Sequence, residues 1–147
     1  AVKDINFVKE ASKTFGTQCM VVAVDAKKTS EGKWEIFTHG GRKNTGIDAI
    51  DFTKQAEENG AGEILLTSMD KDGTKTGYDL ELLNKVTSSI NIPVIASGGA
   101  GKLEHLYDAI KTGGASAVLA ASIFHYGEFT IKETKEYLKS KNVPIRL

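Results

Sequence analysis

Short apolar runs alternate along the chain with longer segments in which apolar positions recur every three or four residues. The apolar runs predict strands over residues 20–24, 63–67, 93–96 and 117–120. The longer segments predict amphipathic helices over residues 4–15, 48–59, 80–90, 103–112 and 131–141. Residues 34–38 add one strand of a small hairpin, whose turn is expected at Glu31 and Gly32.

This order of elements is one leading helix and then four strands, each followed by a helix. Strands that alternate with helices are typical of a parallel sheet with right-handed crossover connections. The sequence contains no linker, low-complexity tract or shift in composition that would mark a domain boundary. We therefore expect an α/β fold in which residues 1–147 form a single domain.

Composition narrows the possible functions. The 147 residues are 40% hydrophobic and 26% charged, and 19 Lys and Arg balance 19 Asp and Glu. No net positive charge favours nucleic acid or an acidic membrane, and no run of 18 apolar residues predicts a membrane span. The single cysteine, Cys19, precludes an internal disulfide and fits a reducing compartment. We expect a cytoplasmic protein in which Cys19 packs beside the first strand.

Small and polar residues gather where the predicted strands end, which is where parallel α/β folds bind ligands. Residues 97–101 read Ser-Gly-Gly-Ala-Gly between a strand and a helix. Glycines there allow the backbone to approach a phosphate group closely, and the following helix offers unpaired N–H groups. Ala121 and Ser122 follow the next strand. The two segments predict one shared phosphate site, although a tight turn without a ligand would also explain the glycine pair.

Candidate catalytic acids follow two other strands. Asp25 comes directly after the first apolar run, where a carboxylate would act as a general base if a substrate came within hydrogen-bond reach. Asp70 and Asp72 flank Lys71 after the second run, and either of them could be structural. The spacing alone leaves a solvated loop acid open for Asp25. The three histidines are scattered and have no metal-ligand spacing, so no metal site is expected.

Taken together, these strand ends resemble the second half of the cyclase subunit of imidazole glycerol phosphate synthase. The resemblance covers essentially the whole chain, as strands five to eight of a (βα)8 barrel with their helices. It is carried by the residues 22–27, 43–46, 60–68, 70–79, 95–101 and 119–125. The implied fold is half of a TIM barrel, with four parallel βα units and a leading helix.

The resemblance implies a reaction. Members of this family use ammonia from a glutaminase partner to convert a bisphosphorylated aminoimidazole-carboxamide ribonucleotide to imidazole glycerol phosphate and the carboxamide nucleotide. The reaction belongs to histidine biosynthesis and needs no metal or redox cofactor. By resemblance, Asp25 is the fifth-strand catalytic acid/base and Asp72 has a supporting catalytic role. Glu63 matches one charge of the gate through which ammonia enters the barrel. The phosphate site is assigned to Gly73, Gly98, Gly99, Ala121 and Ser122.

The chain departs from the family in lacking strands one to four, and with them the other catalytic aspartate. It begins where a fourth strand would have ended, as an engineered half, a proteolytic fragment or part of a longer protein would. Four strands cannot close a barrel, so we expect two sheet edges and one sheet face to be exposed and to drive self-association, most simply into a two-fold dimer. We also expect the chain alone to be inactive as a cyclase.

Two other interpretations remain open at this point. The isomerase of the preceding step has a related barrel with a fifth-strand aspartate and a similar Ala-Ser-Gly-Gly segment. Residues 43–46, 77–79 and 121–124 resemble the cyclase rather than that isomerase. The second alternative is a non-catalytic module that binds phosphate and associates with itself.

Overall fold

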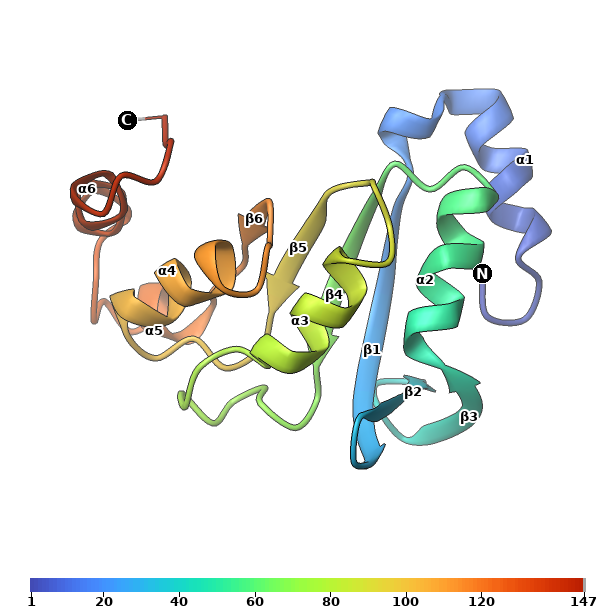
Figure 1. The fold of residues 1–147 in the computed structure, drawn as a ribbon, viewed down its shortest axis with the longest axis horizontal. Helices are drawn as coiled ribbons and strands as arrows, with labels where there is room; N and C mark the ends of the chain where they lie inside the picture. The colour runs from blue at the N-terminus through green and yellow to red at the C-terminus, as the bar shows by residue number, and fades with distance from the viewer. Residues whose placement is uncertain (147) are drawn as a thin grey trace.

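This computed structural model describes residues 1–146 of the chain. These residues contain a six-stranded sheet with helices packed on it (Figure 1). The strand order is β3-β2-β1-β4-β5-β6. Four neighbouring strands are parallel: β1 (Val21–Ser30), β4 (Glu63–Ser68), β5 (Val94–Ser97) and β6 (Ala117–Val118). A hairpin of β2 (Lys33–Thr38) and β3 (Lys43–Asp48) extends the sheet antiparallel to β1.

Helices precede, connect and follow the parallel strands. They are α1 (Asn6–Phe15), α2 (Ala49–Glu58), α3 (Leu80–Thr87), α4 (Leu103–Lys111), α5 (Ser122–His125) and α6 (Ile131–Ser140), with a short 3₁₀ turn at Thr17–Cys19. Along the sheet, α2, α3 and α4 follow one another on one side, and the two chain termini lie at opposite ends of the molecule (Figure 1). Within residues 1–146, none of the helices has the length and hydropathy that a membrane crossing requires.

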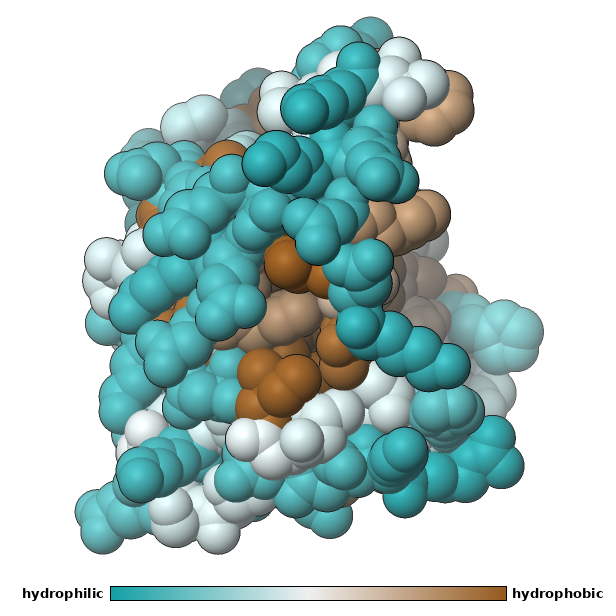
Figure 2. Space-filling model, turned by 90° about the vertical axis from the view of Figure 1, so that its right-hand side faces the viewer, coloured by the Kyte–Doolittle hydropathy of each residue, from teal (hydrophilic) through white to brown (hydrophobic). Residues whose placement is uncertain are grey.

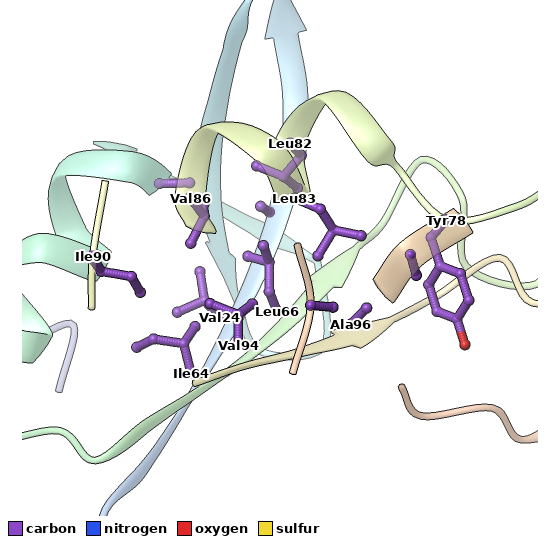
Figure 3. Packing of buried hydrophobic residues seen from close by; sticks show 14 of the residues in the cluster. Val24, Ile64, Leu66, Tyr78, Leu82, Leu83, Val86, Ile90, Val94 and Ala96 are labelled. Carbon is purple, nitrogen blue, oxygen red and sulfur yellow. The ribbon is translucent and has the colours of Figure 1, made fainter. Parts of the chain in front are cut away.

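The side of the sheet under these helices forms the hydrophobic core because alternate residues of a strand point to opposite faces. Val24, Leu66 and Ala96 belong to the buried set, and the apolar side of α3 packs against it (Figure 3). The α3 residues in this contact are Leu82, Leu83 and Val86. The amphipathic pattern that predicts a helix in this segment thus agrees with the side of α3 that is buried.

In the described part of the chain, the other face of the sheet is not covered by α2, α3 or α4. Its apolar side chains are partly exposed, as at Val21, which is 51% exposed, and Leu119, which is 43% exposed. Ala23, Leu65 and Ile95 stand side by side on this face in neighbouring strands. We call this side of the sheet the open face. The side of the molecule where α1 and α2 lie is different: hydrophilic residues cover most of it, and hydrophobic residues form only a small central group (Figure 2).

The structure differs from the sequence-based expectation in several places. The predicted hairpin turn at Glu31 and Gly32 is present, but β1 continues to Ser30 instead of ending at residue 24, and β3 was not expected, so the sheet is mixed. The short helix α5 was also missed, and α3 ends at Thr87 instead of residue 90. These segments are short or polar, so they carry little periodic signal. Cys19 is exposed, so the expectation that it packs beside the strand is wrong.

The Asp79 carboxylate joins three elements at one point. It caps the N-terminus of α3 by accepting a hydrogen bond from the Leu82 N–H at 3.0 Å. Its other oxygen accepts hydrogen bonds from the indole N–H of Trp34 at 3.1 Å and from the Ser68 hydroxyl at 3.3 Å. Trp34 and Ser68 are almost completely buried. Asp79 therefore ties the hairpin, β4 and α3 together.

We expect Asp79→Ala to lower the free energy of unfolding by about 2–4 kcal/mol, because it removes a cap and leaves buried donors of Trp34 and Ser68 unpaired. Asp48→Ala is the matched control, since Asp48 caps α2 by accepting hydrogen bonds from the Ile50 and Asp51 N–H groups and, within residues 1–146, from no other element. It should cost only about 1 kcal/mol. Urea unfolding at one protein concentration measures both; equal losses would show that Asp79 is no more than a helix cap.

Candidate functional site

A cavity of about 150 Å³ opens at the carboxyl ends of β4, β5 and β6. Parallel strands bring these three ends to the same edge of the sheet, so segments far apart in the sequence meet there. The cavity is lined by Asp72, Gly73, Lys75, Ser97, Gly98, Gly99, Ala100, Leu119, Ala120, Ala121 and Ser122. The structure therefore brings together Asp72 and all five residues predicted for the phosphate site.

Unpaired backbone amides are the main polar groups of this cavity. Within residues 1–146, the N–H groups of eight lining residues donate to no backbone oxygen: Gly73, Lys75, Gly98, Gly99, Ala100, Ala120, Ala121 and Ser122. Several backbone N–H groups around one concavity form an anion-binding nest. We refer to residues 97–100 as the β5 arm of this cradle and to residues 119–122 as the β6 arm.

Glycine is required in the β5 arm for two reasons. Gly98 and Gly99 have φ values of 89° and 106°, a region that residues with a side chain rarely adopt. A Cβ atom on Gly99 would also lie 2.2 Å from the Gly77 carbonyl oxygen, and one on Gly98 would lie 2.7 Å from that of Ser68. The arm thus packs directly on the backbone of neighbouring segments, which fixes its position.

The charged side chains on the cavity wall offset each other. Asp72 contributes a carboxylate, and Lys75 contributes an ammonium group that also pairs with Glu128 from the segment after α5. Attraction for an anion must therefore come chiefly from the backbone amides, with Lys75 as an additional cation. Lys75 was not predicted as a site residue, because nothing in its sequence context distinguishes it from other surface lysines.

Asp25 lies on the same edge of the sheet but outside the cavity. It pairs in register with Thr67 of β4, which in turn pairs with Ser97 of β5, so these three polar residues form a row on the open face. Two strand spacings of about 4.8 Å place Asp25 roughly 10 Å from Ser97 on the cavity wall. No residue between 1 and 146 donates a hydrogen bond to the Asp25 carboxylate, which is half-buried and free to act on a ligand.

Thr67 and Ser97 were not predicted as site residues. The signal that would have identified them is the alternation of each strand, because both lie on the same face as Asp25 and at the same height. A row of a carboxylate and two hydroxyls on the rim of this cavity can provide hydrogen-bonding partners for the hydroxyl and amide groups of a ligand.

The structure separates the roles of the two acids after β4. The Asp70 carboxylate accepts a hydrogen bond from the Lys28 N–H at 2.7 Å, which ties the loop after β4 to β1. Asp70 is therefore structural, and Asp72 is the acid on the cavity wall. The sequence predicts that the N-terminus of the helix after residues 97–101 contributes N–H groups to the phosphate site. This expectation is wrong for α4, because the lining of the β5 arm ends at Ala100 and α4 begins only at Leu103.

Glu63 lies at the opposite end of the sheet. It is the first residue of β4 and pairs in register with Val21 on the open face. Along β4 the open face therefore runs from Glu63 through Leu65 to Thr67, from the amino end of the strand to the row that contains Asp25. Among residues 1–146, no group of three or more His, Cys, Asp or Glu side chains is placed to hold a metal ion.

Comparison with known proteins agrees with the motifs at the strand ends. A family described as "Histidine biosynthesis protein" matches residues 1–130. The imidazole glycerol phosphate synthase subunit HisF of Endomicrobium trichonymphae is 67% identical over 146 residues, which are 99% of this chain and 56% of that protein. The chain thus spans about half the length of this curated relative.

We expect Gly99→Ala to destabilise the fold by at least about 3 kcal/mol, because a left-handed backbone and a clash with the Gly77 carbonyl add together. Gly73→Ala is the matched control. Gly73 also lines the cavity with a positive φ of 74°, but a Cβ atom there would meet nothing within 4 Å. It should cost only about 1–2 kcal/mol. Chemical denaturation tests the difference, and similar costs at both positions would contradict the packing described for the β5 arm.

Proposed function

Because the chain belongs to the histidine biosynthesis protein family, we propose that it forms strands five to eight of a (βα)8 barrel, the C-terminal half of a cyclase subunit of imidazole glycerol phosphate synthase. Four parallel strands in sequential order, with helices on one side only, are the arrangement that such a half would have. In this proposal the open face is the side that lines the interior of the complete barrel.

The proposed reaction of the complete barrel is ring closure with ammonia. A glutaminase subunit supplies the ammonia, and the substrate is a bisphosphorylated aminoimidazole-carboxamide ribonucleotide. The products are imidazole glycerol phosphate and the carboxamide ribonucleotide, a lyase-type outcome in the cytoplasmic pathway to histidine. The observation that carries this proposal is the anion cradle, which lies on the same rim as a free carboxylate, Asp25.

Each site residue has a role in this proposal. The two arms of the cradle hold one phosphate group of the substrate through backbone N–H groups, which adds binding energy remote from the reacting atoms. Asp25 moves protons during ammonia addition and ring closure, as a general acid/base held roughly 10 Å from the phosphate site. Asp72 supports it from the cavity wall. No metal or redox cofactor takes part.

Glu63 is proposed as one charge of an ammonia gate. It lies at the amino end of β4, on the face that would line the barrel and at the end opposite to the cradle. Ammonia that entered beside Glu63 would pass Leu65 before it reached the row of Asp25 and Thr67. A passage of this kind keeps ammonia away from water, where it would be protonated and lose its nucleophilicity.

A second candidate function applies to the chain by itself. The cradle is complete within residues 1–146, whereas the proposed mechanism also needs a second aspartate from strand one of the barrel. The isolated chain would then bind phosphate without turnover. The related isomerase is not favoured, because the similarity extends over 99% of the chain at 67% identity to a HisF subunit.

We expect Asp25→Asn to lower kcat by at least about 100-fold in a barrel reconstituted from this chain and the complementary half, because the amide cannot carry the proton. Phosphate affinity should stay unchanged, since Asp25 is not part of the cradle. Asp51→Asn, which alters an exposed acid on α2, serves as the control. Steady-state cyclase kinetics with added ammonia measure the effect. Unchanged turnover would remove Asp25 from the mechanism.

The isolated chain should form a two-fold dimer through its open face and sheet edges, because apolar side chains such as Val21 are exposed there. Val21→Lys should shift the dimer toward monomers, because burying the new charge would be costly. Ile131→Lys is the control, since Ile131 is 54% exposed but lies on α6, which packs against α4. Light scattering at micromolar concentration reports the mass. A mainly monomeric unsubstituted chain would refute the proposed interface.

A further inference from the structure

Tyr78 connects the loop before α3 to the β6 arm of the cradle. Its side chain is only 4% exposed, and its hydroxyl donates a hydrogen bond to the carbonyl oxygen of Leu119 at 2.8 Å, 41 residues further along the chain. The ring lies next to Ala96 at the end of the hydrophobic cluster, with its oxygen directed away from the cluster (Figure 3). Burial raises the pKa of Tyr78, so the hydroxyl stays protonated and remains a donor.

The Leu119 carbonyl is the next acceptor of the β5–β6 ladder. The Leu119 N–H donates to the Ala96 carbonyl at 2.8 Å. In a regular parallel ladder, the following bond would run from the N–H of Gly98 to the carbonyl of Leu119. That bond is not formed: Gly98 leaves the strand with a φ of 89°, and its N–H reaches no backbone oxygen in the described chain. The Tyr78 hydroxyl occupies the place of the missing donor.

We propose that Tyr78 is a positioning residue of the anion cradle, whose hydroxyl satisfies the Leu119 carbonyl in place of the Gly98 N–H and thereby leaves that N–H to the bound phosphate group. This inference rests on the proposed phosphate site. Without the hydroxyl, the partly buried Leu119 carbonyl would lack a partner within the described chain, which is costly. The closest available donor along the ladder is the Gly98 N–H, and pairing with it would withdraw that amide from the cavity.

Gly77, the residue before Tyr78, holds the β5 arm of the cradle. The Gly77 N–H donates to the Gly99 carbonyl at 2.8 Å, so consecutive residues of one loop hold the β5 arm and the β6 arm. The C=O and N–H of a planar trans peptide point in opposite directions. With the Leu119 carbonyl held by Tyr78, the Ala120 N–H is directed away from Tyr78, and Ala120 lines the cavity. The loop at residues 77–78 therefore sets the geometry of both arms.

The test compares Tyr78→Phe with the unsubstituted chain in binding inorganic phosphate and in amide hydrogen exchange. The phenylalanine keeps the ring and removes only the hydroxyl. We expect phosphate affinity to fall on the order of fivefold, the factor that one hydrogen bond typically contributes. In phosphate-free buffer, the Gly98 amide should exchange faster than that of Ala96 in the unsubstituted chain and should become protected in Tyr78→Phe. Destabilisation alone would accelerate exchange of the Gly98 amide, whereas the new bond to the Leu119 carbonyl would slow it.

Thr53→Val is the matched control. The Thr53 hydroxyl is also fully buried and donates to a carbonyl, that of Ile50, at 2.8 Å, but it lies in α2, outside the cradle. The control should leave phosphate affinity and Gly98 exchange unchanged. Equal effects of the two substitutions, or unaltered Gly98 exchange in Tyr78→Phe, would overturn the role of Tyr78 while leaving the phosphate site intact. If the unsubstituted chain showed no phosphate binding at the cradle, the site and the role of Tyr78 would both be overturned.

Discussion

The parallel register of β1, β4, β5 and β6 is the constraint on which the rest of the structure depends. It aligns Asp25, Thr67 and Ser97 in one row and brings the two arms of the cradle to the same rim. Backbone N–H groups that leave a ladder at the end of a strand need another acceptor, because an unpaired donor is costly. In the proposed function, an anion satisfies several of these N–H groups at once. The chemistry of the site thus follows from where the strands stop pairing.

The surrounding structure holds these strand ends in place. The Asp70 carboxylate bonds the loop after β4 to β1, and Asp79 joins the hairpin, β4 and α3. The glycines at 98 and 99 pack against backbone atoms of the same loops. Rigid support of this kind would keep the distance between the proposed phosphate site and the proposed acid/base constant, which matters because a small misplacement of reacting groups lowers the rate.

The four parallel strands, their helices and the residues of the cradle could be predicted from the sequence because they rest on local signals: apolar runs, amphipathic periodicity, and glycines directly after a strand. The extension of β1 and the strand β3 could not, since polar, exposed residues such as Lys27 and Lys43 carry no alternation. The bonds from Asp70 to Lys28 and from Tyr78 to Leu119 join residues 42 and 41 positions apart. Contacts of that kind depend on the finished packing and leave no local pattern.

The most direct measurement of the central claim is a crystal structure of the chain grown with inorganic phosphate. The account predicts a phosphate ion in the cavity, within about 2.7–3.1 Å of backbone nitrogens of both Gly99 and Ser122. It also predicts Asp25 on the same rim and without a bond to that ion. An empty cradle with phosphate bound elsewhere, or the two arms lying apart, would contradict it.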